Sequence, residues 1–300
     1  MYRHNRITID LNAIRHNYRL MAEYLSKPVR VMAVVKANAY GHGMLEVAKT
    51  VTQAGCTDLA VAIPEEGVAL RESGLKDVSI LILGAVNRES VETCIRFGLI
   101  MTVFTPDMLI HIEAEAQRLQ KAAFVHIKLD SGMGRIGLRT LQEARTLADM
   151  LPNAPHVKVS GLYTHFADAD HMDECGGLCS YSNNQLITFD KLRACFDPSI
   201  PVHASNSAMS LVSPDANFSM IREGISLYGY PPVPTGLPFR RALHWEAEIV
   251  HVKAIEAGCS IGYGCTFTSS EPMTIATIAA GYGDGYHRTA SNRGEVLIKG

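Results

Sequence analysis

Lys36 is the residue whose surroundings point most directly to chemistry. It follows a short apolar run, residues 29–35, and precedes the polar and glycine-rich segment ANAYGHG. A lysine at the end of a buried strand loses hydration, so its pKa falls and its neutral amine can attack a carbonyl to form a Schiff base. The alternative interpretation is that Lys36 only ends a strand and reaches solvent.

Two further segments have the residue types that bind a phosphate group. Asn206 and Ser207 follow one apolar run, and a serine hydroxyl can donate to a phosphate oxygen. Gly224 and Ile225 follow the next run, and a glycine lets backbone N–H groups approach an anion closely. Ser207 could instead serve as a helix N-cap.

These residues need a scaffold that carries them to one place, and the apolar periodicity predicts one. Short β-branched runs alternate with helical spacing, as βα units do. The eight runs are residues 29–35, 58–62, 78–83, 99–104, 123–129, 157–163, 201–204 and 220–226. Eight such units can close into a (β/α)8 barrel, whose active sites lie at the carboxyl ends of the strands. An open doubly wound sheet is the alternative.

The pattern changes at both ends of this region. Residues 10–25 have the spacing of an amphipathic helix capped by Asp10. The proline-rich segment YPPVPTGLP begins at Tyr230, and the later residues 247–255, 273–279 and 295–298 read as strands. We therefore expect a barrel over residues 1–232 and a β domain over residues 233–300, with the first residues able to join the β domain.

Composition limits the partners. The 300 residues include 28 Lys and Arg against 30 Asp and Glu, so the basic excess typical of nucleic-acid or membrane-surface binding is missing. Apolar runs stay well below the roughly 20 residues that cross a bilayer, and the opening MYRHNR lacks the apolar stretch of a secretory signal. Seven scattered cysteines suit reduced thiols. These features predict a cytoplasmic protein with a small-molecule substrate, without nucleic acid or membrane partners.

The segment 35–43 resembles the lysine motif of alanine racemases, which are fold type III enzymes that use pyridoxal phosphate (PLP). Other matches occur in the family's order at residues 7–17, 128–137, 164–170, 204–208, 221–229, 262–266 and 281–286. The resemblance implies a barrel with a C-terminal β domain. It also implies a homodimer whose active sites form between the barrel of one subunit and the β domain of the other.

The resemblance implies roles for the barrel residues. Lys36 would hold PLP as an imine. Its phosphate would lie against Tyr40, Ser207, Gly224 and Ile225, with Asn206 beside them. Arg222 would face the ring nitrogen, and His165 would link Arg222 to a second base; by itself, Arg222 could instead form a surface ion pair with Glu223. An arginine only donates, so the ring nitrogen would stay an unprotonated acceptor.

Racemisation needs two acid/base groups on opposite faces of the substrate carbon. By resemblance these are Lys36 for the D-enantiomer and Tyr263 of the partner subunit for the L-enantiomer. A tyrosine has a pKa near 10, so its phenolate must be favoured by the chain of His165 and Arg222. Composition alone would make Tyr263 a core or turn residue. Tyr282 and Arg288 resemble residues of the substrate entryway.

The segment GMGRIG at residues 132–137 fits two hypotheses. It matches the dinucleotide pattern G-x-G-x-x-G, but it follows the fifth strand and places a bulky arginine between the glycines. By resemblance, Arg135 binds the substrate carboxylate or the phenolic oxygen of the cofactor. Lys128 resembles a lysine that is carbamylated in many members of the family. The negative charge of the carbamate would hold Arg135 in place.

One cluster of residues raises the question of a metal site. It comprises His165, Asp168, Asp170, His171, Asp173, Cys175 and Cys179. The spacing is not that of zinc ligands, so we predict a solvated loop and no metal.

The sequence thus predicts a PLP-dependent isomerase that interconverts L-alanine and D-alanine and supplies D-alanine for cell-wall peptidoglycan. The alternatives are a racemase of the same fold that acts on serine or a broader range of amino acids, and a PLP-binding barrel without turnover. Residues 233–300 are fewer than the family's β domain contains. We therefore also expect a chain truncated at its C-terminus that dimerises poorly and turns over slowly or not at all.

Overall fold

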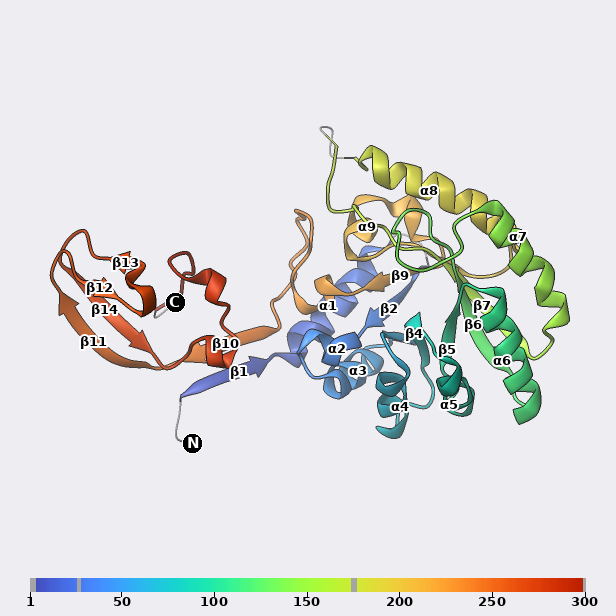
Figure 1. Cartoon of the computed structure of the whole chain (residues 1–300), viewed down its shortest axis with the longest axis horizontal. Coiled ribbons are helices and arrows are strands. Elements are labelled where there is room, and N and C mark those ends of the chain that lie inside the picture. Colours follow the sequence, from blue (N-terminus) through green and yellow to red (C-terminus); the bar gives the residue numbers. More distant parts are fainter. Residues whose placement is uncertain (1–3, 26–27, 174–176, 299–300) are drawn as a thin grey trace. The chain divides into compact units, whose positions relative to one another are not determined.

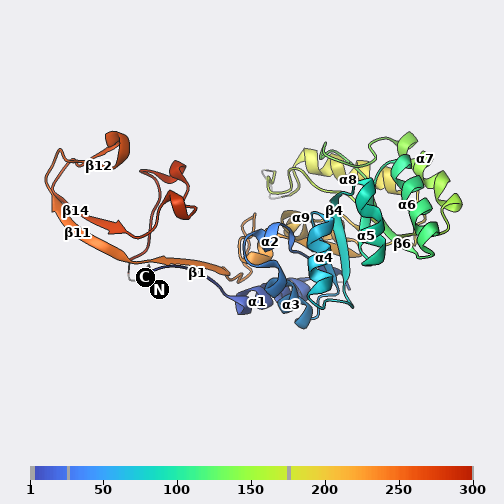
Figure 2. The ribbon, with the colours of Figure 1, turned by 60° about the horizontal axis from the view of Figure 1, so that its bottom comes forward.

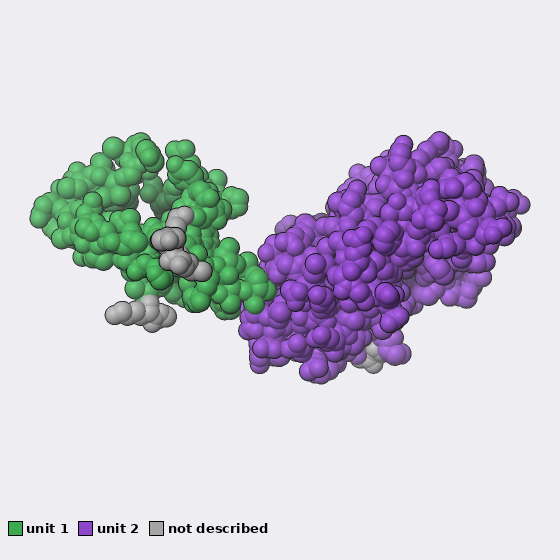
Figure 3. All heavy atoms as spheres, turned by 90° about the horizontal axis from the view of Figure 1, so that it is seen from below, with its two compact units in different colours: residues 1–9, 243–300 green, residues 10–242 purple. Residues whose placement is uncertain are grey.

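The computed structural model describes residues 4–25, 28–173 and 177–298. It divides into two compact units, one formed by residues 10–242 and the other by residues 1–9 together with residues 243–300 (Figure 3). Each unit is described by itself below. Among the described residues, no helix has both the length and the apolar character needed to cross a membrane.

Residues 10–242 form a closed barrel of eight parallel strands (Figure 1). The strands are β2 (Arg30–Val34), β3 (Asp58–Val61), β4 (Ser79–Ala85), β5 (Ile100–Val103), β6 (Ala123–Lys128), β7 (Val157–Tyr163), β8 (Val202–His203) and β9 (Met220–Glu223). The ring closes where β2 pairs with β9, from Arg30 opposite Met220 to Ala33 opposite Glu223. The predicted barrel is confirmed, and the open doubly wound sheet is wrong.

Helices cover the outside of the barrel. They are α1 (Leu11–Tyr24), α3 (Met44–Gln53), α4 (Pro64–Glu72), α5 (Val91–Arg96), α6 (Pro106–Leu119), α7 (Leu141–Met150), α8 (Ser180–Arg193) and α9 (Ser207–Val212), with 3-10 turns η1 (Arg88–Ser90), η2 (Leu151–Asn153), η3 (Pro214–Asn217) and η4 (Ile225–Tyr228). In two views α4, α5 and α6 lie outside the strands that precede them (Figures 1 and 2). The Asp10 side chain accepts from the backbone N–H of Asn12 and of Ala13, which confirms the predicted cap of α1.

The apolar runs became strands because both of their faces are covered. Inside the barrel a buried cluster fills the space between the strands: Met32, Val34, Ala60, Leu81, Ile100 and Met220. Each large apolar side chain buried in this way contributes about 1.5–3 kcal/mol to folding. The barrel therefore gives the site at its strand ends a rigid base.

The second unit is a β domain, as predicted. Its β1 (Asn5–Ile9) pairs antiparallel with β10 (Leu243–Ala247), so the first strand joins the segment that directly follows the barrel. In addition β11 (Ile249–Ile255) pairs with β14 (Met273–Ile278), and β12 (Ser260–Ile261) pairs with β13 (Phe267–Thr268). The 3-10 turn η5 (Tyr263–Cys265) lies between β12 and β13, and η6 (Tyr282–Asp284) and η7 (Arg288–Ala290) follow β14.

The predicted strand at residues 295–298 is wrong. Val296, Leu297 and Ile298 are exposed and lie outside the strands of the described chain. A β-branched run becomes a strand only where a neighbouring backbone pairs with it, and none of the described segments does so here.

Candidate active site

A cavity of about 550 Å³ opens at the carboxyl ends of the barrel strands. All ten site residues that the sequence predicted within the barrel line it: Lys36, Tyr40, Lys128, Arg135, His165, Asn206, Ser207, Arg222, Gly224 and Ile225. They come from five different strand ends, which parallel strands necessarily bring to one side of a barrel. The cavity thus unites residues that are up to 189 positions apart in the chain.

Lys36 opens a short left-handed turn, α2 (Lys36–Tyr40). Residues Ala37 to Tyr40 all have φ between 52° and 54°, a region that L-residues with a Cβ rarely occupy. Glu66 holds the turn, because one carboxylate oxygen accepts from the Ala37 N–H at 2.6 Å and the other from the Ala62 N–H at 2.8 Å. Sequence reasoning missed both the turn and Glu66, since nothing in the local pattern marks either one.

The surroundings of Lys36 favour its neutral amine. Burial lowers the pKa of Lys36, the nearby Arg135 guanidinium lowers it further, and Glu66 opposes the shift. The Nζ atom lies 5.9 Å from the centre of the Tyr40 ring. Lys36 is therefore placed and tuned to act as a nucleophile or a base.

Ser207 and Gly224 form the centre of a turn suited to an anion. The Ser207 Oγ accepts from the Gly224 N–H at 3.0 Å and from the Ser226 N–H at 3.4 Å, so its single proton is directed away from these two groups. A Cβ on residue 224 would lie 2.9 Å from the Tyr40 Oη, which explains why glycine is needed there. We call Ser207, Gly224, Ile225 and Ser226 the anion turn.

The N-cap interpretation of Ser207 is wrong. Asn206 precedes α9 and accepts from the Met209 N–H at 3.0 Å, so Asn206 is the cap. The hydroxyl of Ser207 is thereby left to the anion turn.

Arg222 is buried, with 3% of its surface exposed, and both of its Nη atoms have hydrogen-bond partners. Its Nη1 lies 2.9 Å from the His203 Nδ1, and its Nη2 lies 2.8 Å from the carbonyls of Thr164 and Ala204 and 3.2 Å from the His165 Nδ1. The alternative of a surface ion pair is wrong, because Arg222 points into the barrel and Glu223 lies on the opposite face of β9.

The hydrogen-bond chain continues from Arg222 into the barrel. His203 contacts His126 at 2.9 Å between Nε2 and Nδ1. Burial lowers the pKa of His126 to about 3 and that of His165 to about 2, and Arg222 contributes to both shifts. Burial and Arg222 also hold the pKa of His203 well below its usual range. Sequence reasoning missed His126 and His203, although His126 shares the inward face of β6 with Lys128.

Lys128 lies on the cavity floor and is almost fully buried. Its Nζ donates to the Leu129 carbonyl at 3.2 Å and lies 4.9 Å from the centre of the Tyr163 ring. Burial and the neighbouring Arg222 hold the pKa of Lys128 well below its usual range. Its surroundings thus favour an uncharged amine.

The segment around Arg135 is a loop of the barrel. The Leu138 N–H donates to the Lys128 carbonyl at 2.9 Å, and α7 begins only at Leu141. A dinucleotide fingerprint requires a strand, the glycine turn and a helix in direct succession. The dinucleotide hypothesis is therefore wrong, and Arg135 is instead an exposed side chain on the cavity wall.

Tyr263, Tyr282 and Arg288 belong to the other unit, and they begin three of its 3-10 turns. The side chain of Tyr263 is 84% exposed and that of Tyr282 is 71% exposed. Gly262 and Gly264, with φ of 75° and 76°, allow the tight turn that presents Tyr263. Tyr263 is thus an exposed turn residue of its unit and not a core residue.

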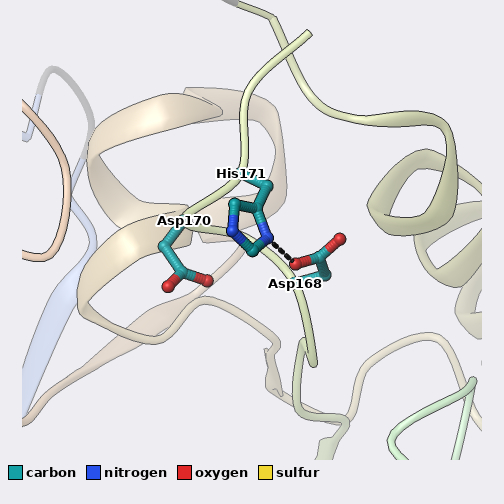
Figure 4. Close-up of side chains that lie close together, drawn as sticks. All are labelled: Asp168, Asp170 and His171. Carbon is teal, nitrogen blue, oxygen red and sulfur yellow. Dashed lines mark hydrogen bonds and ion pairs between the residues drawn. The ribbon is translucent and has the colours of Figure 1, made fainter.

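The acidic cluster lies on the loop after β7. Figure 4 shows Asp168, Asp170 and His171 together, with His171 hydrogen-bonded to Asp168. That contact raises the pKa of His171 and lowers that of Asp168. His165 points instead to Arg222, and Cys175 lies outside the described residues.

The other members of this cluster have local partners. Asp173 accepts from the Gly177 N–H at 2.7 Å, and Cys179 caps α8 through the Ser182 N–H. The contacts of Asp173 and Cys179 both stay within the loop and the start of α8. Asp170 also lines the main cavity.

Family models and curated relatives both match this chain in sequence. The family model "Alanine racemase, N-terminal domain" matches residues 9–232, and "Alanine racemase, C-terminal domain" matches residues 242–300. An alanine racemase of Listeria monocytogenes is 41% identical over 300 residues, covering 98% of this chain and 78% of the relative. One of Symbiobacterium thermophilum is 41% identical over 295 residues, covering 97% and 77%.

Solved structures give the same result. The alanine racemase of Streptomyces coelicolor A3(2) has a TM-score of 0.89 at 31% identity, covering 99% of this chain and 80% of that one. The alanine racemase of Bartonella henselae, solved with covalently bound pyridoxal phosphate, has a TM-score of 0.86 at 30% identity, covering 95% and 78%.

Proposed function

The chain belongs to the alanine racemase family, and we propose that Lys36 and Tyr263 are the two acid/base groups with which it interconverts L-alanine and D-alanine. The reaction class is isomerisation. The observation that carries the assignment of the site is the convergence of Lys36, the anion turn and Arg222 in one cavity.

We further propose that this cavity holds PLP, and its residues fit that group. The anion turn can take the phosphate. Because Gly224 has no Cβ, the Tyr40 hydroxyl can lie close to this turn. Lys36, whose pKa is lowered, suits the aldehyde end. When bound, PLP supplies a carbonyl that captures the substrate amine and a conjugated ring that accepts electrons from the Cα–H bond.

Arg222 would control the protonation of the cofactor's ring nitrogen. Its guanidinium only donates hydrogen bonds, and its contacts with two carbonyls and two histidines hold it in place. A ring nitrogen held opposite Arg222 would stay an unprotonated acceptor. Arg222 would thereby limit electron withdrawal by the ring and favour return of the proton to Cα over side reactions.

Tyr263 is the proposed second base, contributed by a partner subunit. Its side chain is exposed on its own unit, so it is accessible to another chain. Lys36 would then exchange the proton of the D-enantiomer at Nζ and Tyr263 that of the L-enantiomer at Oη. The contact of His165 with Arg222 supplies positive charge that favours the phenolate.

The remaining assignments concern substrate binding. Arg135 lies on the cavity wall, where it can pair with a carboxylate through two N–H groups. The buried amine of Lys128 suits carbamylation, and a carbamate would attract Arg135. Tyr282 and Arg288 would border the entrance in the dimer. A cytoplasmic location and the supply of D-alanine to peptidoglycan stay predictions.

A labelling experiment tests the assignment of Lys36. The holoenzyme is reduced with borohydride, digested, and searched for the pyridoxyl-modified peptide. We expect the label on Lys36 and none on Lys128, the other lysine of the cavity. A label on Lys128, or on a lysine outside the cavity, would contradict the proposal.

Mixing two inactive variants tests the shared active site. Lys36→Ala and Tyr263→Phe should each abolish racemisation, and α-proton exchange of L-alanine should stop in Tyr263→Phe. Mixed dimers contain one site with both residues intact, so mixing should restore activity. Tyr24→Phe on α1 serves as the control for changing an exposed tyrosine and should retain α-proton exchange. Failure of the mixture to recover would place both groups on one subunit or remove Tyr263 from the mechanism.

A chiral product assay tests the substrate. Alanine, serine, lysine and arginine are offered in parallel, and alanine should have the highest kcat/KM. Faster racemisation of serine or of a larger amino acid would favour the alternative of broader specificity. Membership of an enzyme family already argues against a barrel without turnover.

A further inference from the structure

Glu223 is a buried acidic residue that the mechanism above does not use. It ends β9 directly before Gly224 of the anion turn, and only 1% of its surface is exposed. Its Oε1 contacts the Ser210 Oγ at 2.7 Å. Its Oε2 is buried without a hydrogen-bond partner among the described residues. A buried ionised carboxylate requires bonds to both oxygens, so this environment suits a neutral acid.

Ser210 cannot donate to Glu223 and to a backbone carbonyl at the same time. The Ser210 Oγ also lies 3.1 Å from the Ser207 carbonyl, which can only accept. A hydroxyl has a single proton to donate. If Ser210 donates to that carbonyl, the proton in the contact between Ser210 and Glu223 must come from the carboxyl group.

Few charged groups surround Glu223. The α9 helix packs against β9 with only hydroxyl and apolar side chains, and β2 places Ala33 opposite Glu223. On the inward faces of β8 and β9 lie His203 and Arg222, which bond to each other. From η4, Tyr228 contributes a phenol that donates to the Val34 carbonyl.

Two other neighbouring segments contribute titratable groups. The α2 turn and the residues after it supply Lys36, Tyr40 and His42, and η3 supplies the exposed Asp215. Burial raises the pKa of Glu223, while the hydroxyls of Ser210 and Ser207 oppose the increase. Burial is the largest of these influences, so the carboxyl group is held towards its neutral form.

Building on the proposed function, we propose that Glu223 is a proton-linked regulator of the anion turn: it is neutral when the turn holds a phosphate monoester, and its ionisation weakens binding of that phosphate. The physical link is short. Ser207 accepts from the Gly224 N–H, and Gly224 follows Glu223 in the chain. A carboxylate at this position would repel a phosphate group that carries close to two negative charges. Glu223 is thus a positioning residue and not a catalytic one.

The test compares PLP with pyridoxal, which lacks the phosphate. Dissociation constants of both are measured by imine absorbance over a pH series from acidic to alkaline, in the parent and in Glu223→Gln, which keeps the shape but cannot ionise. The ratio of the two constants cancels the titration of Lys36, which both ligands share. In the parent, the advantage of PLP should fall about tenfold as Glu223 ionises, whereas in Glu223→Gln it should stay constant. Parallel profiles in the two proteins overturn the proposal.

A second measurement needs only the parent. Calorimetry in buffers of different ionisation enthalpy gives the protons taken up on binding, and PLP should take up more than pyridoxal in the pH range where Glu223 titrates. Equal uptake overturns the proposal, even if Glu223→Gln does not fold.

A third arm separates this proposal from the proposed function. If neither aldehyde forms an imine, the cofactor assignment fails. Inorganic phosphate is then the probe, read as protection of the full chain against thermal unfolding. Protection that weakens at alkaline pH in the parent alone supports Glu223, and equal protection of both proteins overturns it.

Discussion

The Nη1 of Arg222 lies 2.9 Å from the Nδ1 of His203, and this contact sets the protonation of the barrel interior. Because an arginine only donates, the His203 Nδ1 must accept and its proton must lie on Nε2. That proton is donated to the Nδ1 of His126 at 2.9 Å. A single guanidinium therefore keeps two buried histidines neutral and orients both rings.

Acid should destabilise the barrel through these histidines. The pKa of His126 is lowered to about 3 by burial, against 6.5 in the unfolded chain, so folding loses stability as the pH falls below 6.5. At pH 5 this one group accounts for about 2 kcal/mol. His126→Gln cannot take up that proton and still accepts from His203. The free energy of unfolding, measured with denaturant at pH 7 and pH 5, should therefore fall less in the variant.

The control for this prediction is His111→Gln on α6, a histidine at the surface that contacts the Arg88 carbonyl. It should retain the parent's loss of stability between the two pH values. An equal loss in His126→Gln and the parent would show that His126 is not held neutral.

The pKa of Lys36 should move in opposite directions in two variants. Arg135 lowers it and Glu66 raises it, after the larger effect of burial. Arg135→Gln should therefore raise the pH at which pyridoxal forms half of its imine, and Glu66→Gln should lower it. Imine absorbance over a pH series measures both. A shift of the same sign in the two variants would contradict the placement of these charges.

The left-handed turn after Lys36 should respond to substitution in the opposite sense to a normal helix. Ala37 is exposed with a φ of 52°, where a Cβ costs about 1–2 kcal/mol. Ala37→Gly removes that strain and should be neutral or stabilising by up to about 1 kcal/mol, since glycine also gains freedom in the unfolded chain. Ala37→Val should be destabilising by at least about 1 kcal/mol. Denaturant unfolding measures both.

The matched control is Ala114, which is exposed within the right-handed helix α6. Ala114→Gly should cost about 1 kcal/mol. If Ala37→Gly destabilises the protein as much as Ala114→Gly does, the turn is not strained as described.

Adding one methyl group to the anion turn should weaken phosphate binding. The Cβ of Gly224→Ala would lie 2.9 Å from the Tyr40 Oη and would push the hydroxyl away. We expect the dissociation constant of PLP to rise at least about tenfold, with little change for pyridoxal. Gly236→Ala is the control, because a Cβ there meets open space. An unchanged affinity for PLP in Gly224→Ala would remove the anion turn from the phosphate site.

Much of the scaffold could be predicted because hydrophobic periodicity is local. The eight apolar runs became the eight barrel strands, and Asp10 caps α1. The β-branched run at residues 295–298 shows the limit of this reasoning. Apolar character indicates what a segment can form, but a strand also needs a partner backbone, and local sequence contains no information about that partner.

The sequence by itself determined which barrel residues come together in one cavity. Lysine, serine, glycine and arginine at the ends of parallel strands must meet on one side of a barrel, and all ten predicted barrel residues line one cavity. Only the tertiary structure decided how these residues are held and charged. Glu66, His126, His203 and Glu223 act through contacts between segments far apart in the chain, and burial sets the protonation of the two histidines and of Glu223. Desolvation depends on what surrounds a group in space, so it emerges only when the barrel closes.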